Sequence, residues 1–335
     1  MDVQLLRIET VDYHTGGEPF RIVVGGVGPL GGSSILDKRT YAIDHLDDVR
    51  RLLVFEPRGH ADMYGCFVTD PAEGADLGVV FFHNDGYSTA CGHGTIALVT
   101  WALEQGVVPI RGAEQTVVVD VPSGRVRTVA EIAGSKVTAV TFQNVPSFVV
   151  DTGVTVTTSK GEVDCDISFG GAFYASVEAR ALGLSVHARD LNPLIALGRE
   201  IKAQLETSRD VKHPEEPRLT GIYGVIFFED CESGGDLCQR NVTIFADGEV
   251  DRSPCGSGTS ARLALLDATG RLPRGATLEH RSIVDSVFTA RVSSRTSVAE
   301  MEAVVTEVRG SAFLSGRHVF ELDRDDPIGT GFLLR

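Results

Sequence analysis

The chain has 335 residues, of which 31 are basic and 46 acidic, so its net charge is −15 at pH 7. This length favours two domains, and 42% hydrophobic with 23% charged residues is ordinary for a folded globular protein, which excludes extensive disorder. The acidic balance argues against nucleic acid and against an anionic membrane surface, because both are bound by clustered Lys and Arg. The first residues show no secretory signal, and no apolar run reaches the about 18 residues of a spanning helix, so we expect a cytoplasmic protein.

The predicted elements are mostly strands, with a few helices between them. A short helix is expected at Asp44–Leu53 with Asp44 as its cap, and a longer amphipathic helix at Leu191–Leu205. Apolar runs predict strands at Leu77–Phe82, Thr116–Val121, Val137–Phe142, Asn241–Phe245, Val284–Val292 and Ala303–Val308. Two further helices, Ile96–Gln105 and Ser260–Thr269, are each followed by a glycine that ends a helix.

An internal repeat sets the organisation of the chain. Residues Cys91–Thr95 read CGHGT and residues Cys255–Thr259 read CGSGT, an offset of 164 residues. The register continues to a matching glycine and proline in each copy, Gly106 with Gly270 and Pro109 with Pro273. Upstream, Gly16-Gly17 has a rough counterpart in Gly170-Gly171. The chain therefore reads as two tandem copies of one unit.

Each copy places its cysteine in a Gly-rich turn between a strand and a helix. Two β-rich copies with one central helix each predict an α+β (α/β) fold of two pseudo-symmetric domains that face each other across a cleft holding the active site. We place the junction in the polar stretch Thr152–Glu162. The predicted domains are residues 1–160, with a return of residues 320–335 left open, and residues 161–319.

Six cysteines are present, and none forms a C-x-x-C pair, which makes a structural zinc site unlikely. In the cytosol all six thiols are expected to stay reduced. Cys66 and Cys165 are expected in buried strands, and Cys231 and Cys238 in an exposed polar loop.

Cys91 and Cys255 differ from the other cysteines because both are predicted at a helix N-terminus. There the unsatisfied N–H groups and the helix dipole favour a thiolate and lower the pKa of a thiol. The neighbouring glycines let a carboxylate approach the same N–H groups. Two such turns would place a thiol on each side of one ligand, which is the layout that removes a proton from one face of a carbon and returns one to the other. The alternative is that both are ordinary turn residues kept by the duplication.

Several motifs resemble the proline racemase superfamily, which includes proline racemase, hydroxyproline 2-epimerase and trans-3-hydroxy-L-proline dehydratase. They are His14–Pro19, Phe55–His60, Cys91–Gly94, Gly170–Phe173 and Asp251–Gly256. The resemblance covers almost the whole chain. It implies two similar domains with the substrate between them, as in diaminopimelate epimerase. It also implies no metal, pyridoxal phosphate or nucleotide cofactor.

The resemblance also implies a role for each matching residue. Cys91 and Cys255 match the two catalytic thiols, and His93 and Asp251 match the residues that hold the ring nitrogen of the substrate. The turns whose N–H groups bind the substrate carboxylate match Gly92, His93, Gly256 and Ser257. The expected partner is a small imino acid, proline or hydroxyproline, and a homodimer is left open.

The choice between reactions depends on Cys255. Several stretches look most like the trans-3-hydroxy-L-proline dehydratases: His60–Gly65, His83–Ser88, Gly170–Ala175 and Gly331–Arg335. Those enzymes usually carry threonine where this chain has Cys255, and elimination has no obvious need for a second thiol. We therefore favour a racemase or epimerase that uses two thiols, with the dehydratase as the alternative. A binding protein without catalysis is a more remote alternative, since it would need neither thiol.

Overall fold

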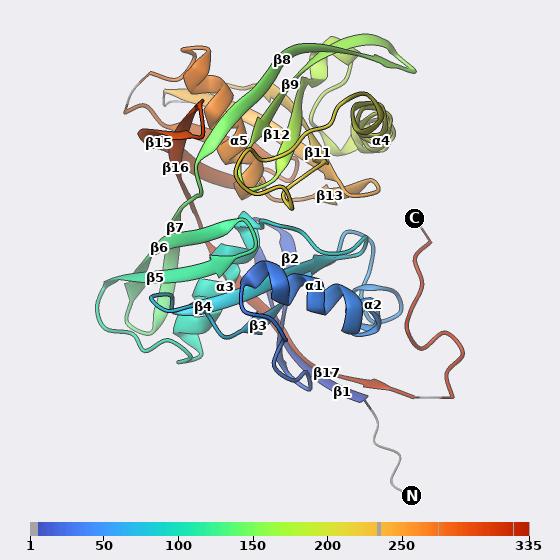
Figure 1. Cartoon of the computed structure of the whole chain (residues 1–335), viewed down its shortest axis with the longest axis vertical. Coiled ribbons are helices and arrows are strands. Elements are labelled where there is room, and N and C mark those ends of the chain that lie inside the picture. The colour runs from blue at the N-terminus through green and yellow to red at the C-terminus, as the bar shows by residue number, and fades with distance from the viewer. Residues whose placement is uncertain (1–5, 233–235, 274, 324, 335) are drawn as a thin grey trace, which may run out of the picture. The chain divides into compact units, whose positions relative to one another are not determined.

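The computed structural model describes residues 6–232, 236–273, 275–323 and 325–334 (Figure 1). The chain divides into two compact units. Unit 1 comprises the described residues up to Val140 and from Ser311 onward, and unit 2 comprises those from Thr141 to Gly310. Within the described ranges, none of the helices has the length and apolarity needed to cross a membrane.

Unit 1 is a mixed sheet with three helices. Its elements are β1 (Leu6–Thr15), β2 (Glu18–Gly25), α1 (Ile35–His45), α2 (Asp47–Val54), β3 (Tyr64–Thr69), β4 (Leu77–His83), α3 (Gly92–Glu104), β5 (Glu114–Val121), β6 (Gly124–Ala133), β7 (Lys136–Gln143) and β17 (Ala312–Leu322). Strand β1 pairs antiparallel with β2 and with β17. The pairs β2–β3 and β4–β5 are parallel, and β3–β4 and β5–β6 are antiparallel. The parallel connections carry the helices, as the crossover between parallel strands requires.

Unit 2 repeats this order. Its elements are β8 (Ser147–Thr158), β9 (Gly161–Phe169), β10 (Phe173–Glu178), the short 3₁₀ helices η1 (Ala179–Leu182) and η2 (Ala188–Asp190), α4 (Leu191–Ser208), β11 (Ile222–Asp230), β12 (Leu237–Phe245), β13 (Glu249–Asp251), α5 (Gly256–Ala268), β14 (Leu278–Ser282), β15 (Val287–Val298) and β16 (Met301–Gly310). The pairs β10–β11 and β12–β14 are parallel. The other neighbours pair antiparallel, and β16 pairs with β8, which closes the sheet on itself. The predicted α+β class and the duplication are thus confirmed.

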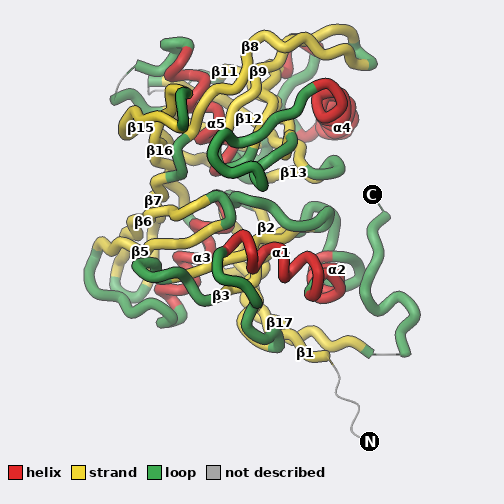
Figure 2. Tube along the Cα trace, in the orientation of Figure 1, coloured by secondary structure: helices red, strands yellow, loops and turns green. Residues whose placement is uncertain are grey.

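A buried helix lies at the centre of each unit. All residues from Gly92 to Leu103 of α3 and from Gly256 to Leu266 of α5 are buried. Helix α3 packs against β1, β2, β3, β6 and β17, and α5 packs against β8, β9, β10, β15 and β16. Figure 2 shows each helix in red among the yellow strands of its unit. Helices buried on all sides can carry small and apolar residues around their whole circumference, and most residues of both helices are of this kind, with the buried Arg262 of α5 as an exception.

Two predicted helices illustrate what local pattern can and cannot locate. Helix α4 confirms the amphipathic stretch that begins at Leu191. The helix predicted from Asp44 to Leu53 corresponds to α2, but its predicted start and cap are wrong, because Asp44 lies inside α1 and α2 starts at Asp47. The true start of α1 is fixed by Ser34, whose hydroxyl accepts from the Asp37 N–H while the Asp37 carboxylate accepts from the Ser34 N–H.

The compact units divide the chain differently from the predicted domains. The predicted junction at residues 160 and 161 falls in the turn between β8 and β9, which pair as a hairpin within unit 2. Unit 2 therefore begins 20 residues earlier, at Thr141, and the return to unit 1 begins at Ser311 rather than at residue 320. The cause is an exchange of strands between the copies. The last strand of the first copy, β8, pairs with β9, and the last strand of the second copy, β17, pairs with β1.

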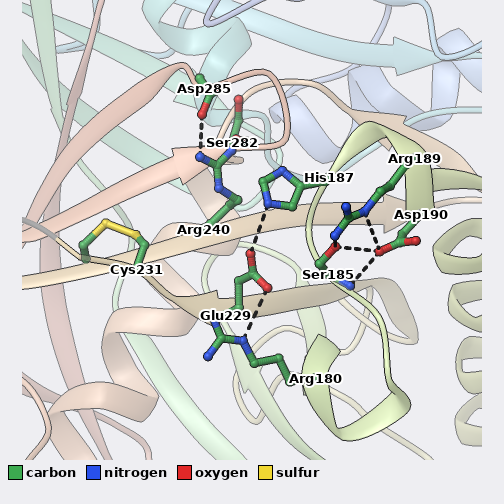
Figure 3. Close-up of polar contacts among 11 residues, drawn as sticks. Arg180, Ser185, His187, Arg189, Asp190, Glu229, Cys231, Arg240, Ser282 and Asp285 are labelled. Atoms are coloured by element: carbon green, nitrogen blue, oxygen red, sulfur yellow. Dashed lines mark hydrogen bonds and ion pairs between the residues drawn. A yellow bond between two sulfur atoms is a disulfide. The ribbon is translucent and has the colours of Figure 1, made fainter.

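The expectation of six reduced thiols is wrong for one pair. Cys231 and Cys238 form a disulfide, with their Cα atoms 5.1 Å apart, where β11 ends and β12 begins. The antiparallel register of these strands brings them together, since the Cys231 N–H also donates to the Cys238 carbonyl. Figure 3 shows this disulfide near a polar network in which Glu229 of β11 pairs with Arg180 and His187. The free cysteines Cys66 and Cys165 are buried in β3 and β9, as predicted.

The disulfide closes a short loop, so we predict a contribution to stability at the lower end of what disulfides usually provide. Replacing Cys231 and Cys238 together by alanine should lower the free energy of unfolding by at most about 2.5 kcal/mol, the loop-entropy value for a loop of this size. Urea unfolding monitored by circular dichroism measures this. Wild-type protein unfolded in dithiothreitol should lose the same amount. A larger loss in the variant than in the reduced wild type would instead point to packing of the sulfurs.

Candidate active site

Cys91 is the N-cap residue of α3, as predicted. Its sulfur accepts a hydrogen bond from the Gly94 N–H at 3.2 Å, and the residue is 5% exposed. A Cβ atom on Gly94 would lie 2.6 Å from this sulfur and 2.4 Å from the ring of Phe20. Glycine at this position therefore makes the room in which the thiol lies over the first turn of the helix.

His93 lies beside this thiol. Its ring nitrogens Nε2 and Nδ1 are 3.4 and 3.6 Å from the Cys91 sulfur, and the rings of Phe20 and Tyr64 contact the imidazole edge-on. The hydroxyl of Thr15 donates to the His93 carbonyl at 2.9 Å, which ties the start of α3 to β1. Burial lowers the pKa of His93 to about 3, so the imidazole is neutral near pH 7 and offers one donor and one acceptor nitrogen.

Cys255 occupies the equivalent position before α5, again as predicted. A Cβ atom on Gly258 would lie 2.9 Å from the Cys255 sulfur, which repeats the relation of Gly94 to Cys91. The two caps differ in backbone conformation. Cys255 has a φ angle of 61°, whereas Cys91 has the extended value of −152°. A non-glycine residue adopts such a positive φ only when its surroundings impose it.

Those surroundings are a chain of hydrogen bonds from Asp251. The carboxylate oxygen Oδ1 of Asp251 accepts from the N–H and the hydroxyl of Ser253, at 2.8 and 2.7 Å. The Ser253 hydroxyl accepts in turn from the Cys255 N–H at 3.1 Å. Burial raises the pKa of Asp251 to about 6, against the opposing effect of the Ser253 hydrogen bonds. Ser253 thus connects the Asp251 carboxylate with the Cys255 N–H.

The thiol of Cys255 departs from the behaviour expected at a helix N-terminus. Burial raises its pKa to about 12, the nearby Asp251 carboxylate adds to the rise, and contacts with Thr243, the Gly258 N–H and Tyr174 oppose it. The prediction that this position lowers the pKa is therefore wrong for Cys255, because desolvation outweighs the helix N–H groups. In the ligand-free protein Cys255 is a protonated thiol, suited to donating a proton.

Tyr174 of β10 contacts this turn, although its role was left open from the sequence. Its hydroxyl is 2.7 Å from the Ser257 hydroxyl and 3.9 Å from the Cys255 sulfur, and the side chain is fully buried. Its position in the sequence could have pointed to Tyr174, because the residue lies three positions after the second glycine of Gly170-Gly171.

The structure thus gathers the predicted site residues into two turns. The first turn, in unit 1, contains Cys91, Gly92 and His93, and the second, in unit 2, contains Asp251, Cys255, Gly256 and Ser257. Each turn combines a buried thiol with the N-terminus of a buried helix, where the first N–H groups require acceptors such as a carboxylate. In the part of the chain that is described, no three His, Cys, Asp or Glu side chains gather as a metal site would require.

Known proteins resemble the chain over nearly its full length. The family model for proline racemase matches residues 10–333. A trans-3-hydroxy-L-proline dehydratase from Bacillus cereus is 48% identical over 326 residues, 97% of each chain. A 3-hydroxyproline 2-epimerase from Burkholderia multivorans is 45% identical over 330 residues, 98% of each chain.

A solved structure agrees with these matches. The crystal structure of a hydroxyproline epimerase from Agrobacterium vitis with bound trans-4-hydroxy-L-proline has a TM-score of 0.92 and 32% identity to this chain, and the match covers 100% of this chain and 97% of that one. With the cysteine-capped helices in both units, these matches show that the chain belongs to the proline racemase family.

Proposed function

We propose that the protein is a cofactor-independent epimerase that inverts the Cα atom of proline or a hydroxyproline, with Cys91 and Cys255 as its two acid–base groups. The observation that carries the proposal is the second thiol. Cys255 precedes a buried helix as Cys91 does, and it lies over an equivalent glycine. We further propose that it acts in the cytoplasm on the free imino acid, with neither nucleic acid nor membrane as a partner.

Inversion requires a base on one face of Cα and an acid on the other. The Gly94 N–H and the imidazole of His93 are within reach of the Cys91 sulfur, and these are the contacts that a thiolate base needs. Cys255 is protonated and serves as the acid. In one turnover Cys91 takes the α-proton and Cys255 delivers its own proton to the opposite face. The two thiols have then exchanged protonation states, and the reverse turnover or proton exchange with water restores the starting form.

Substrate binding is assigned to the groups around the thiols. Asp251 is ionised above about pH 6 and can pair with the positively charged ring nitrogen of the substrate. The neutral imidazole of His93 can accept a second hydrogen from the same nitrogen. The substrate carboxylate is assigned to the N–H groups of Gly92, His93, Gly256 and Ser257, where the helix dipoles favour negative charge.

The relatives favour one substrate for the first test. The Bacillus cereus dehydratase and the Burkholderia multivorans epimerase are both named for 3-hydroxyproline, although their reactions differ. We therefore propose trans-3-hydroxy-L-proline as the first candidate. The second candidate function, dehydration of that compound, is favoured by the name of the 48% identical relative. In that reaction Cys91 removes the α-proton, the 3-hydroxyl leaves, and pyrroline-2-carboxylate forms.

Incubation in D₂O separates the two reactions. The wild type should convert trans-3-hydroxy-L-proline into its Cα epimer with deuterium at Cα, as followed by NMR, and L-proline and trans-4-hydroxy-L-proline are tested in parallel. The Cys255→Thr variant should lose inversion by at least about 10²-fold, because the second face has no acid. Loss of the signal of the C3 hydrogen beside the hydroxyl, without inversion of any substrate by the wild type, would establish the dehydratase. Inversion by Cys255→Thr at the wild-type rate would exclude the two-thiol mechanism.

The Cys91→Ala variant should abolish both exchange and inversion, since loss of a positioned base costs about 10²–10⁴-fold. Cys165→Ala is the matched control, because it removes a buried thiol from β9 without touching either turn. It should keep wild-type activity. More than about a tenth of the wild-type rate in Cys91→Ala, with an unchanged melting temperature, would contradict the assignment.

The pH dependence of kcat/KM should report Asp251. Because burial raises its pKa to about 6, the carboxylate is lost as the pH falls through 6, and kcat/KM should fall with it. The Cys255 thiol, with a pKa of about 12, should add no alkaline decline below pH 9. Initial rates between pH 5 and 9 measure this. The Asp251→Asn variant should lose the acidic decline, and a decline that persists there would assign it to another group.

A further inference from the structure

We propose that Tyr174 is a positioning residue for the Cys255 thiol, which it holds through a two-hydroxyl chain with Ser257. In this view the pair of hydroxyls does for Cys255 what His93 does for Cys91. The inference rests on the proposed function, in which Cys255 gains and loses a proton. Tyr174 is a buried side chain that the proposed reaction does not otherwise use.

Two hydroxyl groups lie at contact distance from the Cys255 sulfur. The Ser257 hydroxyl is 4.0 Å from the Cys255 sulfur, and the Tyr174 hydroxyl is 3.9 Å from it, while the two hydroxyls are 2.7 Å apart. The three polar atoms therefore form a closed triangle whose short side joins the oxygens. The ring of Tyr174 is fixed in place by Ala172, Ile226 and Ala261, which pack with it in one buried cluster.

The internal repeat gives this arrangement a counterpart in unit 1. Phe20 and Tyr174 each lie three residues after the second glycine of a Gly-Gly turn, and each ring faces the second residue of its buried helix. In unit 1 this pair is Phe20 with His93, and in unit 2 it is Tyr174 with Ser257. In each unit the second residue of the helix brings a polar group to the thiol, and an aromatic ring lies against that residue. Where the helix carries only a short serine, the ring carries the additional hydroxyl.

A chain of two hydroxyls can serve both protonation states of the sulfur. With the thiol protonated, the S–H donates to Tyr174, whose hydroxyl donates to Ser257. When Cys255 has given its proton to the substrate, both hydroxyls can rotate, so that Ser257 donates to Tyr174 and Tyr174 donates to the thiolate. No proton leaves either oxygen, and the buried negative sulfur gains a donor at the moment when it needs one.

Few other titratable groups face this thiol. Burial and then Asp251 raise the pKa of Cys255, and Arg252 weakly opposes the burial that raises the pKa of Asp251. Tyr174 is itself held neutral, since burial and then the neighbouring Cys255 and Tyr223 raise the pKa of its phenol well above its ordinary value. The phenol therefore keeps its proton at the neutral and mildly alkaline pH of the reaction and of the test, acts as a hydrogen-bond donor, and does not compete for the proton.

The test is Tyr174→Phe, which removes one hydroxyl and leaves a ring of the kind that unit 1 has at Phe20. Iodoacetamide alkylation of the ligand-free enzyme at pH 9, followed by peptide mass spectrometry, reports the thiolate fraction of each cysteine without any substrate. The rate at Cys255 should fall about tenfold or more, the loss expected for a hydrogen bond to a charged group, and the rate at Cys91 should not change. The inversion rate should fall by a similar factor.

Tyr13→Phe is the matched control. Its ring is also fully buried, and its hydroxyl donates to Glu104 of α3, so it loses a tyrosine hydrogen bond in the other unit. It should leave both alkylation rates and the inversion rate at wild-type values. An unchanged melting temperature in both variants, with Cys66 and Cys165 unlabelled until the protein is unfolded, shows that the fold is intact.

A second variant tests the chain as a unit. Ser257→Ala should lower alkylation of Cys255 by less than Tyr174→Phe does, because Tyr174 still donates to the thiolate, and the double variant should lose no more than Tyr174→Phe alone. Unchanged or faster alkylation of Cys255 in Tyr174→Phe, or strictly additive losses in the double variant, would overturn the proposal. Because alkylation needs no turnover, a wild type that inverts no substrate would disprove the proposed function while this measurement still decides the role of Tyr174.

Discussion

The site depends on helix N-termini that are buried inside a sheet. At the surface, water would satisfy the first N–H groups of a helix, but α3 and α5 are buried throughout and their first turns need acceptors from the protein or a ligand. In α3 one acceptor is the sulfur of Cys91 itself. Such a sulfur fits only over a residue without a side chain, which explains Gly94 and Gly258. The proposed carboxylate binding and the proposed thiol chemistry would both use these buried N–H groups.

The two copies have diverged where the proposed inversion needs them to differ. An inverting pair needs one sulfur that receives a proton and one that gives it, although a duplication starts with two identical turns. Here the first turn has a neutral imidazole against the sulfur, and the second has an acidic side chain and two hydroxyls. Burial and, after it, the Asp251 carboxylate raise the pKa of Cys255, which keeps that thiol protonated. The backbone of Cys255, at positive φ, is a further difference between the turns.

The features that depend on local pattern and on the internal repeat could be predicted from the sequence. The cysteines before the two central helices, and the strands around them, followed from the matching CGHGT and CGSGT segments. The pKa of Cys255 did not, because it depends on burial by strands far away in the sequence. Tyr174 was not assigned a role, since its contact with Ser257 joins residues 83 positions apart. The disulfide was missed because the pairing of β11 with β12 decides whether Cys231 and Cys238 meet, and composition cannot show that.

The strand exchange between the copies has a consequence for synthesis on the ribosome. Strand β1 ends at Thr15, and its partner β17 starts at Ala312. Synthesis proceeds at about 5–20 residues per second, so β17 is made roughly 15–60 s after β1. Unit 2, in contrast, has its full set of strands once Gly310 emerges. Unit 1, whose synthesis begins first, is therefore completed last. During that interval β1 presents an unpaired strand edge, which is the kind of surface that chaperones shield from aggregation.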